Sequence, residues 1–265
     1  MDLELRGKVA IVTGGSRGIG KAIARELSRE GCAVALVARG KEALDAAAAE
    51  IGEETGEPVI AESADTANDE NVRQMVANVA ERFGSIDILV NSGSAVGSSV
   101  AFKLPEVTQA AFWGEMNVKV MGYLRCMQHV APHMIEAGWG RIINISGMAA
   151  RTPISIIGSV RNVAVVALTK NAADELGKYG INVTVVHPGQ TLTEHYAEQL
   201  DDWARQRGLT REEALRQRFA SNLIRTPVEP RHIAYVVAFL ASPRSVAING
   251  DVIAVAGGTP GPIFY

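Results

Sequence analysis

Short apolar runs alternate with longer amphipathic stretches along almost the whole chain. The runs are rich in valine and isoleucine, and most of them end in Gly, Asp or Asn, as in KVAIVTGG, IDILVNSG and INVTVVHPG. Continuous apolar runs of this length predict strands that are buried on both faces of a parallel sheet. The stretches between them, such as GIGKAIARELSREG and ENVRQMVANVAERFG, have the period of an amphipathic helix.

This alternation predicts a single α/β domain over residues 1–265, built as a Rossmann-like, doubly wound sheet. Right-handed crossovers then place helices on both faces of the sheet. The length of 265 residues suits one large domain better than two. We expect seven parallel strands, from the runs KVAIVTGG, AVALVAR, PVIAESAD, IDILVNSG, RIINISG, INVTVVHPG and DVIAVAGG.

One region departs from the strand-helix rhythm. Between His187 and Asp251 the chain has a charged helical character, as in DDWARQRGLTREEALRQRF. Thr210 followed by Glu213 fits a capping box, which predicts that a helix begins there. An insertion after a late strand lies at the edge where such sheets bind ligands, so we interpret residues 190–228 as a helical substrate lid. The alternative is a surface helical pair that only packs or oligomerises.

Composition and charge narrow the function classes. Hydrophobic residues make up 47% of the chain and charged residues 21%, and the formal net charge of -3 does not favour a nucleic-acid partner. No apolar run reaches transmembrane length, and the N-terminus lacks the basic region of a signal peptide. Cys32 and Cys126 have no metal-ligand spacing, so we expect buried free thiols and no metal site. These features predict a cytoplasmic protein without a membrane partner.

A glycine-rich turn follows the first predicted strand and opens a helix. In Thr13-Gly-Gly-Ser-Arg-Gly-Ile-Gly20, the residues Gly14, Gly18 and Gly20 give a GxxxGxG spacing. Glycines permit unusual dihedral angles and a close approach of the backbone to a pyrophosphate, and the N-terminus of the helix attracts its negative charge. The strand before the turn and the helix after it are the context that makes this a dinucleotide-binding motif.

Two arginines indicate which dinucleotide is bound. The second strand ends at Ala38 and is followed by Arg39, where a carboxylate would instead accept hydrogen bonds from a ribose 2′-hydroxyl. An arginine suits a 2′-phosphate, and Arg17 in the glycine turn adds a second positive charge. Either arginine alone is often a solvated surface charge. The two together favour NADP(H) over NAD(H).

At these motifs the chain resembles a short-chain dehydrogenase/reductase along nearly its whole length. Further matching elements are Asn91-Ser-Gly-Ser94, RIINIS at 141–146 and the closing NGDVIAVAGG. The resemblance implies that a small-molecule substrate binds beside the cofactor and that the protein is a homotetramer or homodimer. It also implies that Asp65 and Thr66 lie by the adenine, that Asn91 and Gly93 line the cofactor cleft, and that Pro188, Gly189 and Thr193 hold the nicotinamide carboxamide. The candidate cofactor-binding residues are Gly14, Ser16, Arg17, Gly18, Ile19, Gly20, Arg39, Asp65, Thr66, Asn91, Gly93, Pro188, Gly189 and Thr193.

This sequence departs from the family pattern at the catalytic positions. Family members use a tyrosine as general acid/base, and a lysine one helical turn later lowers the pKa of a phenol that is ordinarily about 10. Counted back without a gap from Pro188-Gly189, the tyrosine position falls on Gly158 and the lysine position on Asn162. Glycine has no side chain and an amide does not titrate, so neither residue performs the acid/base step.

The serine that polarises the substrate oxygen in the family is also displaced. Its position falls on Gly147, and Ser146 stands one residue earlier, where a side chain at the end of a strand points differently. Ser146 would substitute for the serine only if the following loop shifts. The loop at 153–158 is shorter than is usual in the family, which allows such a shift.

The asparagine position of the family falls on Lys119. The count without a gap holds from both sides, whereas Asn117 would match only with an insertion. A lysine buried beside the nicotinamide would have a lowered pKa and could act as an acid. The alternative is a lysine that points to solvent. The candidate catalytic residues are therefore Lys119, Ser146 and Asn162.

Other side chains are weaker candidates. His195 and Tyr196 begin the predicted lid and would either supply an acid or face solvent, and Arg151 and Arg161 would either bind an anionic group or remain surface charges.

Three functions remain open. The first is an NADP(H)-dependent oxidoreductase with a substituted catalytic set, the second is a catalytically silent NADP(H)-binding sensor or partner subunit, and the third is a non-redox enzyme on the same fold. The retained cofactor motifs favour the first.

Overall fold

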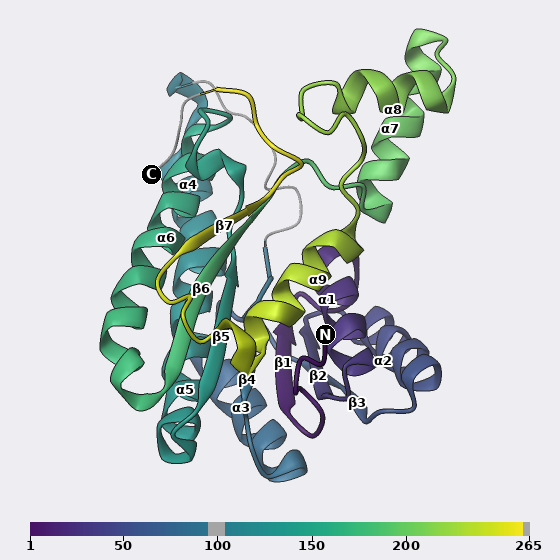
Figure 1. The fold of residues 1–265 in the computed structure, drawn as a ribbon. Coiled ribbons are helices and arrows are strands. Elements are labelled where there is room, and N and C mark those ends of the chain that lie inside the picture. The colour runs from purple at the N-terminus through teal and green to yellow at the C-terminus, as the bar shows by residue number, and fades with distance from the viewer. Residues whose placement is uncertain (95–103, 262–265) are drawn as a thin grey trace.

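The computed structural model describes residues 1–94 and 104–261, and it contains one seven-stranded sheet in which all strands are parallel (Figure 1). The strand order is β3-β2-β1-β4-β5-β6-β7. The doubly wound α/β fold and its seven strands are therefore confirmed. The strands are β1 Val9–Thr13, β2 Ala33–Ala38, β3 Val59–Ser63, β4 Ile88–Asn91, β5 Gly140–Ile145, β6 Ile181–Pro188 and β7 Val252–Val255.

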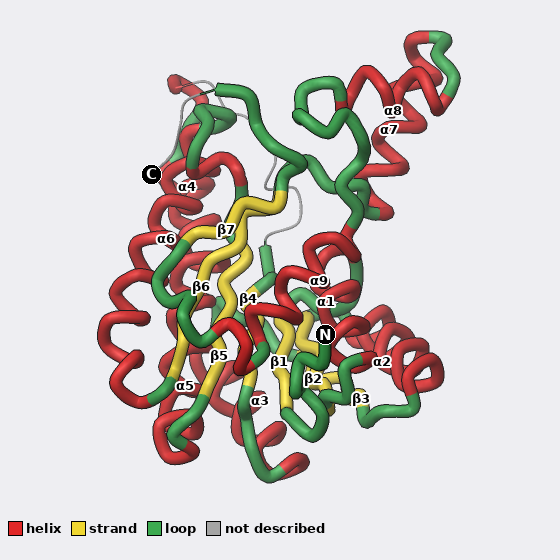
Figure 2. Tube along the Cα trace, viewed as in Figure 1, coloured by secondary structure: helices red, strands yellow, loops and turns green. Residues whose placement is uncertain are grey.

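Helices cover both faces of this sheet, and one pair stands away from it (Figure 2). Helices α1, α2 and α9 share one apolar core with the sheet, and α3, α5 and α6 share the other. The helices are α1 Gly18–Arg29, α2 Lys41–Thr55, α3 Asp69–Phe83, α4 Gln109–Glu115, α5 Gly122–Ala137, α6 Ile156–Leu176, α7 Glu194–Arg207, α8 Arg211–Phe219 and α9 Pro230–Ala241, with a π-helical turn η2 Met116–Met121 between α4 and α5. Among the described helices, none is both long and apolar enough to span a membrane.

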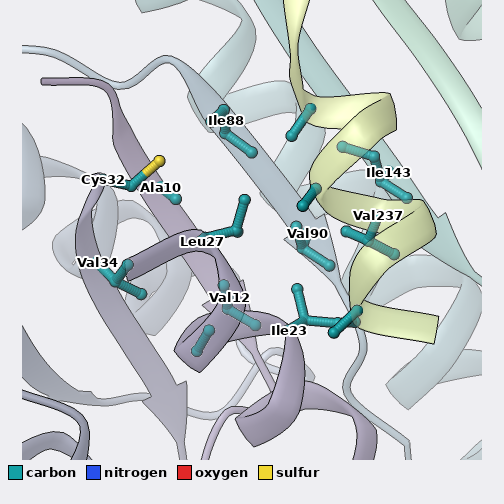
Figure 3. Close-up of a cluster of buried hydrophobic side chains, with 14 of the residues drawn as sticks. Ala10, Val12, Ile23, Leu27, Cys32, Val34, Ile88, Val90, Ile143 and Val237 are labelled. Atoms are coloured by element: carbon teal, nitrogen blue, oxygen red, sulfur yellow. The ribbon is translucent and has the colours of Figure 1, made fainter. Parts of the chain in front are cut away.

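The two apolar cores follow directly from the side-chain alternation of the strands. In β1, Ala10 and Val12 pack into the α1 side, whereas Val9 and Ile11 pack into the α3 side. Figure 3 shows the first core, in which Leu27 of α1 lies between the strands and α9. A strand with apolar residues on both faces has no polar face to turn to water, so it is stable only between two layers of helices.

The strand order reverses direction between β1 and β4, which is where parallel sheets of this kind bind ligands. The chain leaves β1 towards β2 and β3, and then returns to place β4 on the other side of β1. The carboxyl ends of β1, β4, β5 and β6 therefore meet at one edge of the sheet. The glycine turn, Asn91, Ser146 and Pro188 all lie at this edge.

Helices α7 and α8 form a small unit beyond the same edge (Figure 1). Their apolar contacts are mainly with each other, through Leu200, Ala204 and Ala214. Thr210 caps α8, and its side chain and that of Glu213 form the predicted capping box. The two helices are charged on their remaining faces because they pack little against the sheet.

Candidate active site

The glycine turn brings two strand ends into backbone contact. Gly14 has a φ of +68°, and a Cβ there would lie 2.9 Å from the carbonyl oxygen of Ser92. A Cβ on Gly20 would collide with the carbonyl oxygen of Gly14. The turn therefore requires glycine at both positions for steric reasons, and it holds the first N–H groups of α1, those of Gly18 and Ile19, at the edge of the sheet.

The turn after β4 is tied to the end of β1. The Thr13 hydroxyl accepts hydrogen bonds from the N–H groups of Ser92, at 3.0 Å, and Gly93, at 3.2 Å. Asn91 is fully buried, and its Nδ2 donates to Oδ1 of Asn144 at 2.9 Å. Its own Oδ1 has no partner within the described part of the chain. These contacts fix the ends of β1 and β4 relative to each other, at the point where sheets of this kind form a ligand-binding crevice.

The positions assigned to the adenosine end lie at neighbouring strand ends. Arg39 follows β2, and Asp65 follows β3, whose Ser63 pairs with Ala38. Oδ1 of Asp65 accepts the N–H of Ala67 at 3.0 Å, which closes a turn at Thr66. Arg17 and Arg39 are exposed, and neither side chain has a hydrogen-bond or ion-pair partner in residues 1–94 and 104–261. Ser16 precedes Arg17 in the glycine turn and is half-buried.

The end of β6 leads directly into α7. The N–H of Gly189 donates to the carbonyl of Val255 at 3.0 Å, and a Cβ on Gly189 would lie only 2.7 Å from Cα of Ala256. Thr193 then caps α7 by accepting the N–H of Tyr196 at 3.3 Å. Pro188, Gly189 and Thr193 thus line the path from the sheet edge to the α7–α8 unit.

The three candidate catalytic residues converge at the end of β5. Lys119 lies in the π-helical turn η2, is 5% exposed, and donates from Nζ to the carbonyl oxygen of Ser146 at 3.1 Å. The Ser146 hydroxyl donates to the carbonyl oxygen of Asn162 in α6, also at 3.1 Å. A π-helical turn re-aims side chains relative to a regular helix and is frequent at functional sites. Asn117, the alternative to Lys119, instead accepts a hydrogen bond from Arg125 at its Oδ1.

Asn162 is 4% exposed and faces the position of Gly147. A Cβ on Gly147 would lie 3.2 Å from Nδ2 of Asn162. Oδ1 of Asn162 is buried and has no partner among the described residues. An unpaired buried acceptor is costly, so it marks a place where a ligand hydroxyl or a water would be stabilised.

Gly158 lies in the first turn of α6, next to the cap of that helix. Its N–H donates to the Ser155 hydroxyl at 3.0 Å, and a Cβ on Gly158 would collide with the same hydroxyl. A side chain at this position would require the Ser155 hydroxyl to shift.

The electrostatics of the crevice single out Lys119. Burial and, next, the Arg161 guanidinium lower the pKa of the Lys119 amine to about 7, against the opposing attraction of Glu115. Arg161 of α6 forms an ion pair with Glu115 at the end of α4, and both side chains are mostly buried. An ammonium group held in so little water loses its proton near neutral pH.

Two neighbours of Lys119, His187 and Tyr123, are uncharged near neutral pH. Burial, followed by the positive charges of Arg151 and Lys119, lowers the pKa of His187 to about 4. Tyr123 donates its hydroxyl to the carbonyl of Ile145 at 2.9 Å, and burial raises the pKa of this phenol above its ordinary value. The amine of Lys119 is thus the group of this cluster with a pKa closest to neutral.

Two acidic residues with evident roles in this geometry carry no motif in the sequence. Glu115 stands four residues before Lys119, a helical spacing that is its only signal. Glu194 begins α7, and its Oε2 accepts the N–H of Gly18 at 3.1 Å across 176 residues of sequence.

The two candidates at the start of the predicted lid form hydrogen bonds within their own segment. His195 is exposed, and its Nε2 lies 3.0 Å from Nε2 of Gln199. The Tyr196 hydroxyl accepts a hydrogen bond from the side chain of Gln190.

Comparisons with known proteins cover most of the chain and agree on one family. Residues 8–203 match the family model described as short chain dehydrogenase. The chain is 33% identical to a sorbitol dehydrogenase of Cereibacter sphaeroides over 97% of this chain and 98% of that protein. It is also 33% identical to the 3-oxoacyl-[acyl-carrier-protein] reductase FabG of Staphylococcus epidermidis, over 95% of this chain and 98% of that one. The crystal structure of L-sorbose reductase from Gluconobacter frateurii, complexed with NADPH and L-sorbose, superposes with a TM-score of 0.92 at 29% identity, covering 99% and 100% of the two chains.

Proposed function

This chain belongs to the short-chain dehydrogenase family, and we propose that it is an NADP(H)-dependent oxidoreductase in which Lys119 replaces the usual acid. It would interconvert a carbonyl and an alcohol of a small-molecule substrate. The observation that carries the proposal is the buried Lys119 amine, held against Ser146 in the crevice with a pKa of about 7.

Two features of the site residues support binding of a nicotinamide dinucleotide. Gly14 and Gly20 lack the Cβ atoms that would close the phosphate turn, and Oδ1 of Asn162 is a buried acceptor without a partner in the described chain. Arg17 and Arg39 are free to pair with a 2′-phosphate, which favours NADP(H). The bound L-sorbose reductase structure holds NADPH, which supports the same choice. When bound, the cofactor supplies or accepts a hydride at its nicotinamide ring. The residues that would hold it are Gly14, Ser16, Arg17, Gly18, Ile19, Gly20, Arg39, Asp65, Thr66, Asn91, Gly93, Pro188, Gly189 and Thr193.

Lys119 would supply the proton in the direction of reduction and accept it in the direction of oxidation. With a pKa of about 7, both forms of the amine are present near neutral pH, which is the condition for an efficient acid/base catalyst. The hydrogen bond to the Ser146 carbonyl fixes the direction in which Nζ points. Gly158 and Asn162 of α6 do not titrate, so the proton transfer would be performed by Lys119 of η2.

Asn162 would act through its free amide oxygen. This acceptor suits a hydroxyl group of the cofactor ribose or of the substrate. Ser146 already donates its hydroxyl to the Asn162 carbonyl, so it would position Asn162 rather than polarise the substrate.

One observation favours a second candidate, a silent NADP(H)-binding subunit. Nζ of Lys119 and the hydroxyl of Ser146 each bond to a backbone carbonyl, as they would in a purely structural role. Nucleotide titration by nicotinamide fluorescence, followed by NADPH consumption with a panel of ketones, quinones and β-ketoacyl thioesters, separates the two. Binding with turnover supports the enzyme, and binding without turnover of any substrate supports the silent subunit.

We also propose that copies of the chain associate through α6. Val160 is 42% and Val163 is 51% exposed on this helix, and Trp113 of α4 is 64% exposed. Exposed apolar side chains at neighbouring helices suit an interface between copies. Sedimentation of the protein, compared with Val163→Glu, tests this, because a charge in such an interface would favour the monomer.

A further inference from the structure

The α7–α8 unit touches the glycine turn through one carboxylate. Glu194 is the first residue of α7, and its Oε2 accepts the N–H of Gly18, the first residue of α1, at 3.1 Å. Thr193, the cap of α7, packs against the same place, since a Cβ on Gly18 would lie 3.5 Å from its Cγ2. The N-terminus of α7 thus contacts the N-terminus of α1, the helix that would face the cofactor phosphates.

Helix α1 has no acidic group of its own at this end. Its N-cap Arg17 makes no side-chain capping bond, and no acidic residue lies in its first turn. The N-terminus of a helix carries a partial positive charge and unpaired N–H groups, which a carboxylate satisfies. Glu194 supplies that carboxylate from a distant part of the sequence.

The same hollow receives the starts of three helices. Gly18 of α1, Glu194 of α7 and Pro230 of α9 line it together, along with Lys21 and Arg231. Helix α9 already has a capping box of its own, formed by Glu229 and His232, in which the N–H of Glu229 donates to Nδ1 of His232 at 3.1 Å. The carboxylate of Glu194 therefore caps the start of α1 and not the start of α9.

Resting on the proposed function, we propose that Glu194 sets the affinity of the cofactor site by competing with the dinucleotide pyrophosphate for the start of α1. Both groups are anions that seek the same N–H donors and the same positive end of the helix. The arriving pyrophosphate releases the carboxylate from Gly18 or binds against its charge. In either case Glu194 lowers the affinity for the cofactor.

Release of Glu194 also frees the lid. Helices α7 and α8 pack mainly on each other, so a change at the first residue of α7 moves them as one unit. Cofactor binding at the glycine turn is thereby coupled to the position of the α7–α8 unit, which lies beyond the same edge of the sheet. The α7–α8 unit contacts the glycine turn in the cofactor-free protein and is released from it when the cofactor is bound.

The test compares Glu194→Gln with the wild-type chain and with Glu198→Gln. Glu198 is an exposed carboxylate one turn later on α7 that lies by His195, so it is a matched control for the loss of one charge. We expect Glu194→Gln to bind NADPH about threefold to tenfold more tightly in a nicotinamide-fluorescence titration, and Glu198→Gln to bind like the wild type. The gain should shrink as salt rises towards about 1 M, because it is electrostatic.

Hydrogen exchange of the cofactor-free protein gives a second readout. Glu194→Ala removes the contact, and amides at the starts of α1 and α7 should then exchange faster than in the wild type or in Glu198→Ala. NADPH binding by Glu194→Gln that equals or falls below that of the wild type would overturn the competition. Unchanged exchange in Glu194→Ala would overturn the docking of the lid. A complete lack of dinucleotide binding by the wild type and Glu198→Gln would instead contradict the proposed function.

Discussion

Replacing Lys119 by methionine should stabilise the fold while it removes the proposed acid. Methionine has a similar length and no charge, so it fills the same space between η2 and β5 without the cost of burying an ammonium group. The fall of the Lys119 pKa from 10.5 to about 7 corresponds to about 5 kcal/mol, at 1.36 kcal/mol for each factor of ten in proton affinity. This is an upper bound, because a mutant side chain also changes packing.

The sign of the pH dependence follows from the protons bound in each state. Between pH 7 and 10.5 the unfolded chain keeps the proton on Lys119 and the folded chain has lost it, so the stability of the wild type rises with pH in this window. Below about pH 7 both states are protonated and the full cost of the buried charge remains. The advantage of Lys119→Met should therefore be about 4 kcal/mol at pH 7 and should vanish above pH 10.5.

Urea unfolding at pH 6, 8 and 10, followed by circular dichroism, measures this difference. Lys170→Met serves as the control, because Lys170 is exposed on α6. Its stability should differ little from the wild type at every pH. A Lys119→Met variant that is less stable than the wild type at every pH, or whose advantage does not change with pH, would contradict the lowered pKa of Lys119.

Four further substitutions follow from the same geometry. Arg39→Asp should shift the ratio of NADPH to NADH affinity towards NADH by at least about tenfold, and an unchanged ratio in fluorescence titrations would refute the role of Arg39. Gly20→Ala should abolish nucleotide binding or destabilise the fold by more than about 1 kcal/mol, because its Cβ collides with a carbonyl of the same turn; a variant that binds normally in the same titration would contradict this. Arg161→Met should raise the pKa of Lys119 and Glu115→Gln should lower it, since the first removes a repelling cation and the second an attracting anion. Carbon-13 chemical shifts of the lysine Cε, assigned with Lys119→Met, report both changes, and shifts in one common direction would argue against a tuning ion pair.

The fold was predictable from the sequence because its signals are local. The run VAIVT in β1 is buried at every position and apolar up to Thr13, which is the pattern of a strand between two helical layers. The glycine turn was likewise predictable, because a strand, a glycine-rich turn and a helix follow one another directly. Both patterns depend on neighbours in sequence.

The arrangement of the crevice depends on contacts that no local pattern encodes. The position of Lys119 is set by the π-helical turn η2, whose sequence MNVKVM has no distinguishing residue. The ion pair between Glu115 and Arg161 joins two helices, and the contact between Glu194 and Gly18 spans most of the chain. Such pairs form only when the tertiary structure brings the partners together.

The pH dependence of carbonyl reduction in the wild type and in Lys119→Met tests the central claim most directly. With saturating NADPH and a substrate found in the panel, the wild-type rate should fall as the pH rises through about 7, because reduction requires the protonated amine. Lys119→Met should bind NADPH normally and turn over about 10²- to 10⁴-fold more slowly, without that fall. Full turnover by Lys119→Met, or a wild-type profile that is flat across neutral pH, would contradict the assignment of Lys119 as the acid.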